Sequence, residues 1–217
     1  MQVSAEVRWF WPNRPADGLE RWFVDGAAHA GVAAGGGDLR VDEYLVEPAQ
    51  VELGIKSRGG KKGVEVKGLV AVSGRLGETP FEAPVELWTK WTSAALALPS
   101  GSTVRTEKRR WLRKFDGAHN PPREIALGAD ERPKDSSAAL PARGCNVELT
   151  HVLVAGERSW WSFGFESFGT VSTVEKDLAE VARLLAHRRP PSLPGGQAMS
   201  YPAWLSATRS ATPLVRT

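Results

Sequence analysis

Charged residues recur at alternate positions in five segments of this chain, and their types are those that bind phosphate and divalent metal. Because side chains alternate faces along a strand, each segment predicts one charged face and one apolar face. Such strands suit a sheet with one face in water, or a barrel with a charged interior. An interior of mixed Glu, Lys and Arg would suit a polyphosphate anion held together with a divalent metal. The five segments are Glu6-x-Arg8, Glu52-x-Gly54-x-Lys56-x-Arg58, Glu65-x-Lys67, Glu86-x-Trp88-x-Lys90 and Glu148-x-Thr150.

Eight strands and two helices are expected to carry these segments. A first helix is expected over residues 15–28. A second is expected from residue 171 onward, because Val174, Leu178, Val181 and Leu185 recur at helical spacing. Residues 117–143 are rich in Pro, Ala, Gly and charge and predict a long loop. Alternating runs bounded by turn residues predict strands over residues 3–11, 39–46, 51–58, 63–70, 84–91, 103–115, 146–154 and 160–168.

The order of these elements predicts a mostly antiparallel α+β fold. Closing eight antiparallel strands removes both edges of the sheet. We therefore expect an eight-stranded antiparallel β-barrel, or tunnel, over residues 1–189, with a short helix after the first strand and a C-terminal helix. Residues 190–217 contain Arg209 and Arg216 but no acidic residue, and their Pro and Ser content predicts a disordered basic tail.

The composition is that of an ordinary globular protein with a mild excess of base. At 217 residues, 41% of them hydrophobic, the chain is long enough for a substantial core. A formal net charge of +3 favours anionic partners, but it lacks the concentrated basicity of a nucleic-acid binder, and nucleic acid is not expected as a partner. Cys145 is the only cysteine, which excludes an internal disulfide and a cysteine zinc cluster and fits a reducing compartment.

The start of the chain does not resemble a secretion signal. Glu6 and Arg8 place charges where a signal peptide needs an apolar run, and no apolar stretch approaches the roughly 18 residues of a membrane span. We therefore expect a cytoplasmic protein without a membrane partner. The sequence carries no signal for an oligomeric state.

An ordered set of motifs resembles the CYTH, or triphosphate tunnel metalloenzyme, superfamily over roughly residues 3–186. The strongest part pairs Leu53-Gly54-Ile55-Lys56-Ser57-Arg58 with Val64-Glu65-Val66-Lys67-Gly68, which is similar to a family hairpin of Leu-Arg-x-Arg and Thr-x-Lys-Gly strands. The segment Arg40-Val41-Asp42-Glu43-Tyr44 is similar to the family's preceding Asp-x-Tyr strand. Glu148-x-Thr150 and Gly164-x-Glu166 resemble the later Glu-x-Asp and Glu-x-Glu strands.

Several positions depart from the family pattern. The opening signature Glu-x-Glu-x-Lys appears here as Glu6-Val7-Arg8-Trp9-Phe10, and the two hairpin arginines correspond to Gly54 and Lys56. Thr150 and Gly164 stand where carboxylates are expected. The resemblance therefore implies the barrel more firmly than the catalysis.

The resemblance implies different roles for the basic and the acidic side chains. Basic residues would bind the phosphates, while Glu6, Glu148 and Glu166 would coordinate Mg²⁺ or Mn²⁺. The register of strand 103–115 stays open, because Arg109 and Arg113 share one face with Trp111, whereas Lys108 and Arg110 share the other. With the first of these faces inward, the expected phosphate-binding residues are Arg8, Lys56, Arg58, Lys67, Lys90, Arg109 and Arg113.

Two functions follow, from different classes of protein. In the first, the barrel binds a small phosphorylated anion, a triphosphate or polyphosphate, and hydrolyses it weakly with a divalent metal. In the second, it is a non-catalytic binding or scaffold protein whose metal site has decayed. A nucleic-acid-binding barrel is a third alternative, and the charged faces could also be ordinary solvated surfaces. Trp88 and Trp111 share faces with charges and would be the residues to stack a nucleobase or thiamine ring.

Overall fold

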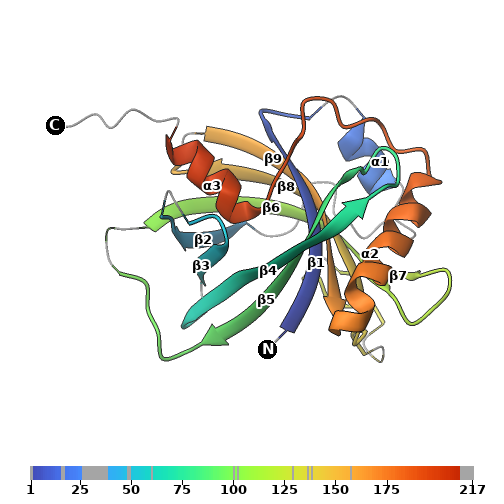
Figure 1. The fold of residues 1–217 in the computed structure, drawn as a ribbon, viewed down its shortest axis with the longest axis horizontal. Coiled ribbons are helices and arrows are strands. Elements are labelled where there is room, and N and C mark those ends of the chain that lie inside the picture. The colour runs from blue at the N-terminus through green and yellow to red at the C-terminus, as the bar shows by residue number, and fades with distance from the viewer. Residues whose placement is uncertain are drawn as a thin grey trace.

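The computed structural model describes residues 2–15, 18–25, 39–47, 50–59, 61–99, 101, 103–128, 130–135, 137, 139–156 and 158–210. Within them the strands are β1 (Gln2–Pro12), β2 (Arg40–Leu45), β3 (Leu53–Arg58), β4 (Val64–Leu76), β5 (Ala83–Ser93), β6 (Thr103–Asp116), β7 (Arg123–Ile125), β8 (Gly144–Val154), β9 (Arg158–Gly169) and β10 (Gln197–Ala198). The helices are α1 (Leu19–Asp25), α2 (Val171–Ala186) and α3 (Tyr201–Ser210) (Figure 1).

Eight of these strands close into an antiparallel barrel in the order β1-β5-β4-β3-β2-β6-β8-β9, and β9 pairs back onto β1. The expected α+β class and eight-stranded antiparallel barrel are therefore confirmed. Two short strands lie outside this cycle: β7 pairs with β6, and β10 pairs with the second half of β1. In the closing pair, Glu6 lies opposite Glu166 and Arg8 lies opposite Gly164.

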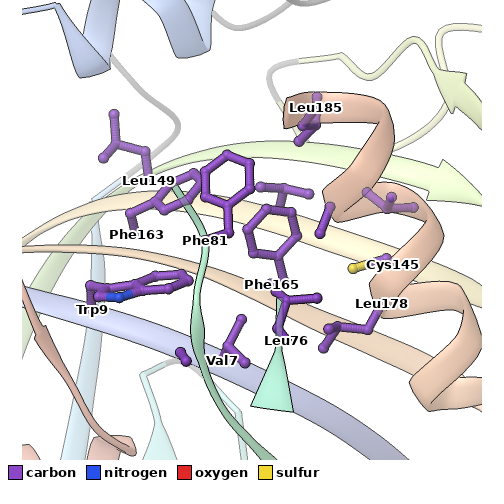
Figure 2. Packing of buried hydrophobic residues seen from close by; sticks show 14 of the residues in the cluster. Val7, Trp9, Leu76, Phe81, Cys145, Leu149, Phe163, Phe165, Leu178 and Leu185 are labelled. Atoms are coloured by element: carbon purple, nitrogen blue, oxygen red, sulfur yellow. The ribbon is translucent and has the colours of Figure 1, made fainter. Parts of the chain in front are cut away.

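The larger hydrophobic core lies outside the barrel wall, beneath α1 and α2. Alternate residues of β1, β8 and β9 point outward and meet the apolar face of α2. Phe81 lies between Phe163 and Phe165, with ring centroids 5.7 Å and 5.0 Å away, and Leu178 of α2 packs in the same cluster (Figure 2). Burying each such side chain contributes about 1.5–3 kcal/mol. On β1, β8 and β9, one set of alternate residues is therefore used outside the barrel wall, which leaves the other set for the interior.

The C-terminal segment differs from the expected disordered tail. Trp204 and Leu205 of α3 are buried in a second cluster with Phe10 and Val152, and the rings of Trp204 and Phe10 stack at 4.5 Å. Helix α3 lies on the opposite side of the barrel from α1 and α2 (Figure 1). The Pro and Ser content of the tail predicted disorder, but the segment contains one short helix whose apolar side packs on the barrel. The tail prediction for residues 211–217 lies outside the described residues.

Other boundaries are shifted. Helix α1 occupies only Leu19–Asp25 of the expected 15–28, and residues 16–17 and 26–28 lie outside the described residues. Strand β4 continues to Leu76, beyond the expected residue 70. The expected loop 117–143 contains β7, whose residues pair with the end of β6. None of the helices in the described ranges has both the length and the apolar character needed to span a membrane.

Candidate functional site

The barrel encloses a charged cavity of about 110 Å³. Every barrel strand contributes to its lining, and the start of α3 closes one side. A wider hollow of about 910 Å³ shares Arg40, Arg58, Lys108 and Arg110 with it, so these four bases border both spaces. Its lining consists of Glu6, Arg8, Arg40, Tyr44, Gly54, Lys56, Arg58, Glu65, Lys67, Trp88, Lys90, Lys108, Arg110, Glu148, Glu166, Ser200, Tyr201 and Pro202.

The alternation of β3 and β4 turns their charged faces inward. Lys56 pairs in register with Glu65, and its Nζ lies 3.1 Å from a Glu65 carboxylate oxygen. Lys67 lies two residues further along β4 and reaches the same cavity. Glu52, which belongs to the same alternating segment, precedes β3 and is exposed, because the strand begins only at Leu53.

Bases outnumber acids in this cavity. Among the described residues, eight Lys and Arg side chains line it, against four Glu side chains. Two further carboxylates pair with these bases: the buried Asp42 lies beside three of them, and Glu131 pairs with Arg110. Two bases are therefore left in excess. Since like charges in a confined space repel one another, the cavity favours an anionic occupant.

Asp42 is the counter-ion for three of these bases. Its carboxylate lies 3.2 Å from Arg40, 3.6 Å from Lys56 and 3.1 Å from Lys108. Burial alone would raise the pKa of Asp42, but Lys108, Lys56 and Arg40 hold it far below its usual range. Burial and the neighbouring charge of Lys56 lower the pKa of Lys108. Asp42 is thus shared among three bases, of which Lys56 also pairs with Glu65.

Aromatic rings enclose the Lys108 amine. Lys108 donates to the Tyr44 hydroxyl at 2.6 Å, and its Nζ lies 4.0 Å from the centre of the Tyr201 ring. Tyr44 and Tyr201 stack at 5.6 Å. Tyr201 comes from α3, so the helix that closes the barrel also supplies part of the cavity wall.

Glu148 is held between two guanidinium groups. Arg8 donates to it at 3.0 Å and Arg110 at 2.6 Å. Burial alone would raise the pKa of Glu148, but Arg110 and Arg8 hold it well below its usual range. The carboxylate is therefore ionised and already accepts two charge-assisted hydrogen bonds.

Lys67 joins the other two predicted metal ligands. Glu6 and Glu166 lie opposite each other on β1 and β9, and the Lys67 ammonium forms an ion pair with both, at 3.4 Å in the case of Glu166. Burial alone would lower the pKa of Lys67, but the two carboxylates raise it. In return, Lys67 outweighs burial and lowers the pKa of Glu166 to about 2.

Three buried hydrogen-bond donors in the cavity lining lack an acceptor. Within the described part of the chain, Arg40 Nε, Arg58 Nε and the Tyr201 hydroxyl have no hydrogen-bond partner. A buried donor without a partner costs about 1–3 kcal/mol. The oxygen atoms of a bound anion are the acceptors that would remove this cost.

The predicted metal ligands do not fit a metal in this arrangement. Glu6, Glu148 and Glu166 all line the cavity, but each already accepts from an ammonium or guanidinium group. Across the described residues, no group of three or more His, Cys, Asp or Glu side chains is placed to hold a metal ion. The Mg²⁺ or Mn²⁺ cofactor stays a prediction from the family resemblance.

Five of the seven predicted phosphate-binding residues lie in the cavity, and the two from β6 do not. The structure turns Lys108 and Arg110 inward, while Arg109 is exposed. Arg113 is buried outside the barrel, where its Nε lies 2.7 Å from a Glu124 carboxylate oxygen. The five residues in the cavity are Arg8, Lys56, Arg58, Lys67 and Lys90.

Sequence reasoning missed several residues of the cavity lining. Arg40, Asp42 and Tyr44 alternate along β2, and this spacing was a usable signal for an inward face. The position of Tyr201 had no such signal, because it depends on how α3 docks. The surplus of bases over acids was likewise hidden until the register of every strand was known.

Both tryptophans that were expected to stack on a ligand are packed against other side chains. Trp88 touches the cavity but is only 1% exposed, and its Nε1 donates to Glu86 at 3.0 Å. Trp111 belongs to the outer core, where it stacks on Trp161 at 5.5 Å. Neither ring presents a free face to a ligand in this arrangement.

No family model matches the chain, and no curated protein is significantly similar to it. The CYTH resemblance therefore rests on the motifs themselves and stays a prediction.

Proposed function

We propose that the barrel binds a small phosphorylated anion, of the triphosphate or polyphosphate class, in its interior. The observation that carries this proposal is the excess of bases over carboxylates, among the described residues, in a cavity enclosed by eight strands. The unpartnered donors of Arg40, Arg58 and Tyr201 support it, since each needs an acceptor oxygen. Guanidinium groups and ammonium groups are the side chains that bind phosphate oxygens best.

A chain of phosphates fits this arrangement better than a single small anion. The inner cavity, about 110 Å³, and a hollow of about 910 Å³ share the bases Arg40, Arg58, Lys108 and Arg110. The hollow adds Lys61 and Arg105 and the carboxylates of Glu43, Asp130 and Glu131, so its described lining still holds more bases than acids. A linear anion with several negative charges would contact these bases in succession.

Binding without hydrolysis is the form of the function that the ion pairs favour. A divalent metal needs carboxylate oxygens that are free to coordinate it. Glu6, Glu148 and Glu166 are instead paired with Lys67, Arg8 and Arg110. Metal-dependent hydrolysis, expected from the family resemblance, is therefore not part of this proposal.

Isothermal titration calorimetry with sodium tripolyphosphate tests the proposal. Wild type should bind one anion, and the double variant Arg58→Ala/Lys90→Ala should bind at least tenfold more weakly, because a hydrogen bond to a charged group contributes about 1.5–3 kcal/mol. The matched control is Arg109→Ala/Lys176→Ala, which removes one Arg and one Lys from exposed positions.

The control should bind tripolyphosphate as wild type does. If wild type shows no binding, or if the exposed double variant loses as much affinity as the cavity double variant, the proposed function is incorrect.

A further inference from the structure

We infer that this barrel carries its own cations at the places where a divalent metal would bind, so that Lys67, Arg8 and Arg110 replace the metal and anion binding is metal-independent. The statement about anion binding rests on the proposed function. The statement about the carboxylates stands on the ion pairs alone.

The first built-in cation is the Lys67 ammonium. Glu6 and Glu166 face each other across the closing strand pair of the barrel, which is a geometry in which two carboxylates can share one cation. Lys67 reaches this pair from β4 on another part of the wall and forms an ion pair with each carboxylate. Because both partners raise its pKa, Lys67 holds its proton at neutral pH. A metal ion would have to displace a charged ammonium group.

The second built-in cation is the Arg8 guanidinium, and Gly164 provides its room. Arg8, Gly164 and Glu148 are successive register partners across β1, β9 and β8. A Cβ atom added to Gly164 would lie 3.1 Å from Arg8 Cγ and 2.8 Å from the Val7 carbonyl oxygen. The absence of a side chain at Gly164 therefore lets Arg8 extend over β9 to Glu148, 3.0 Å away.

Arg110 completes this arrangement from the other side. Its guanidinium lies 2.6 Å from the second Glu148 oxygen, so both oxygens of that carboxylate are taken. Guanidinium groups do not lose their proton at physiological pH, and so they cannot give way to a metal by deprotonation. Arg8 and Gly164 both stand where the family pattern has a carboxylate. The missing side chain at Gly164 leaves the room that the longer side chain of Arg8 uses to reach Glu148.

This arrangement changes what a divalent metal does to binding. In a metal-dependent site, the metal bridges the carboxylates to the phosphates, and chelation abolishes binding. Here the cations that neutralise the anion are part of the chain. Added Mg²⁺ would instead complex the free polyphosphate in solution, and the affinity of the protein for it would stay the same or fall.

Electron paramagnetic resonance of Mn²⁺ tests the carboxylate part directly. Wild type should bind no Mn²⁺ in the cavity. Lys67→Met frees Glu6 and Glu166 while removing one positive charge, and we expect its Mn²⁺ affinity to rise at least about tenfold, which corresponds to about 1.4 kcal/mol. Lys67→Gln is a second variant of the same kind, in case the methionine variant folds poorly.

Lys90→Met is the matched control for these variants. It removes the same charge from the same cavity, but among the described residues Lys90 has no carboxylate within ion-pair distance, so its loss frees no ligand. The Lys90 variant should gain much less Mn²⁺ affinity than the Lys67 variants. Tight stoichiometric Mn²⁺ binding by wild type, or equal gains from both lysines, would overturn the inference.

Calorimetry with tripolyphosphate, in EDTA and in excess Mg²⁺, tests the remaining part. The expected result is binding in EDTA that is at least as tight as binding in Mg²⁺. Binding that requires Mg²⁺ would overturn metal independence while leaving the proposed function intact. Absence of binding under both conditions would contradict the proposed function. The Mn²⁺ measurement would still decide whether the Lys67 ammonium takes the place of a metal ion between Glu6 and Glu166.

Discussion

At the scale of single residues, Asp42 decides the charge balance of the cavity. It is fully buried and is the common partner of Arg40, Lys56 and Lys108. Removing one partner of a buried ion pair is costly, because the remaining charges stay buried without compensation. The same charges would bind an anion if one were supplied.

Replacing Asp42 by Asn should therefore destabilise the protein by about 3–5 kcal/mol. Urea denaturation measures this change, with Asp130→Asn, at an exposed position, as the control. Saturating tripolyphosphate should restore more of the lost stability in the Asp42 variant than it adds to wild type. If the anion stabilises both proteins equally, the charge imbalance at Asp42 does not contribute to anion binding.

The ion pair of Glu166 with Lys67 makes stability depend on pH. The folded-state pKa of Glu166 is about 2, whereas a glutamate in an unfolded chain titrates near 4.3. A lowered carboxyl pKa contributes stability that is fully present above about pH 4.3 and is lost as pH falls through about 2. The expected loss from this residue is on the order of 3 kcal/mol. Urea denaturation at a series of pH values should show a shallower acid dependence for Glu166→Gln, and an unchanged dependence would count against the pair.

At the scale of elements, the sequence predicted strands better than it predicted which face each strand turns inward. The first four residues of β4, Val64-Glu65-Val66-Lys67, alternate between apolar and charged, as do their β3 partners Ile55 and Lys56, so these inward faces followed from the sequence. Strand β6 carries bases on both faces, and only the tertiary structure distinguishes them. Its outward Arg113 is paired with Glu124, which lies in the first part of the loop expected over residues 117–143, a partner that local spacing cannot reveal.

Helix α3 is the element that the sequence concealed, and it should matter for stability. Trp204 is 1% exposed and stacks on Phe10, so Trp204→Ala should cost about 3–5 kcal/mol in the free energy of unfolding. The control is Trp91→Ala, at a position that is 45% exposed, which should cost far less. Equal losses in urea denaturation would mean that α3 does not hold the end of the barrel.

At the scale of the whole molecule, the barrel separates apolar packing from charge. Apolar residues of β1, β8 and β9 pack with α1 and α2 outside the wall (Figure 2), while charged residues of every barrel strand line the cavity. Strand count, antiparallel closure and most inward charges were predictable, because they depend on period-two patterns. The closing contacts of Tyr201 and the pairing of Arg8 across Gly164 were not, because they depend on segments far apart in the sequence.

The central claim is that the interior of the barrel binds a polyphosphate through side chains alone. A crystal structure grown with tripolyphosphate and EDTA tests it most directly. The account predicts phosphate oxygens within hydrogen-bond distance of Arg40 Nε, Arg58 Nε and the Tyr201 hydroxyl, with no metal between Glu6 and Glu166. An anion bound only on the outer surface, with these three donors still unpartnered, would contradict it.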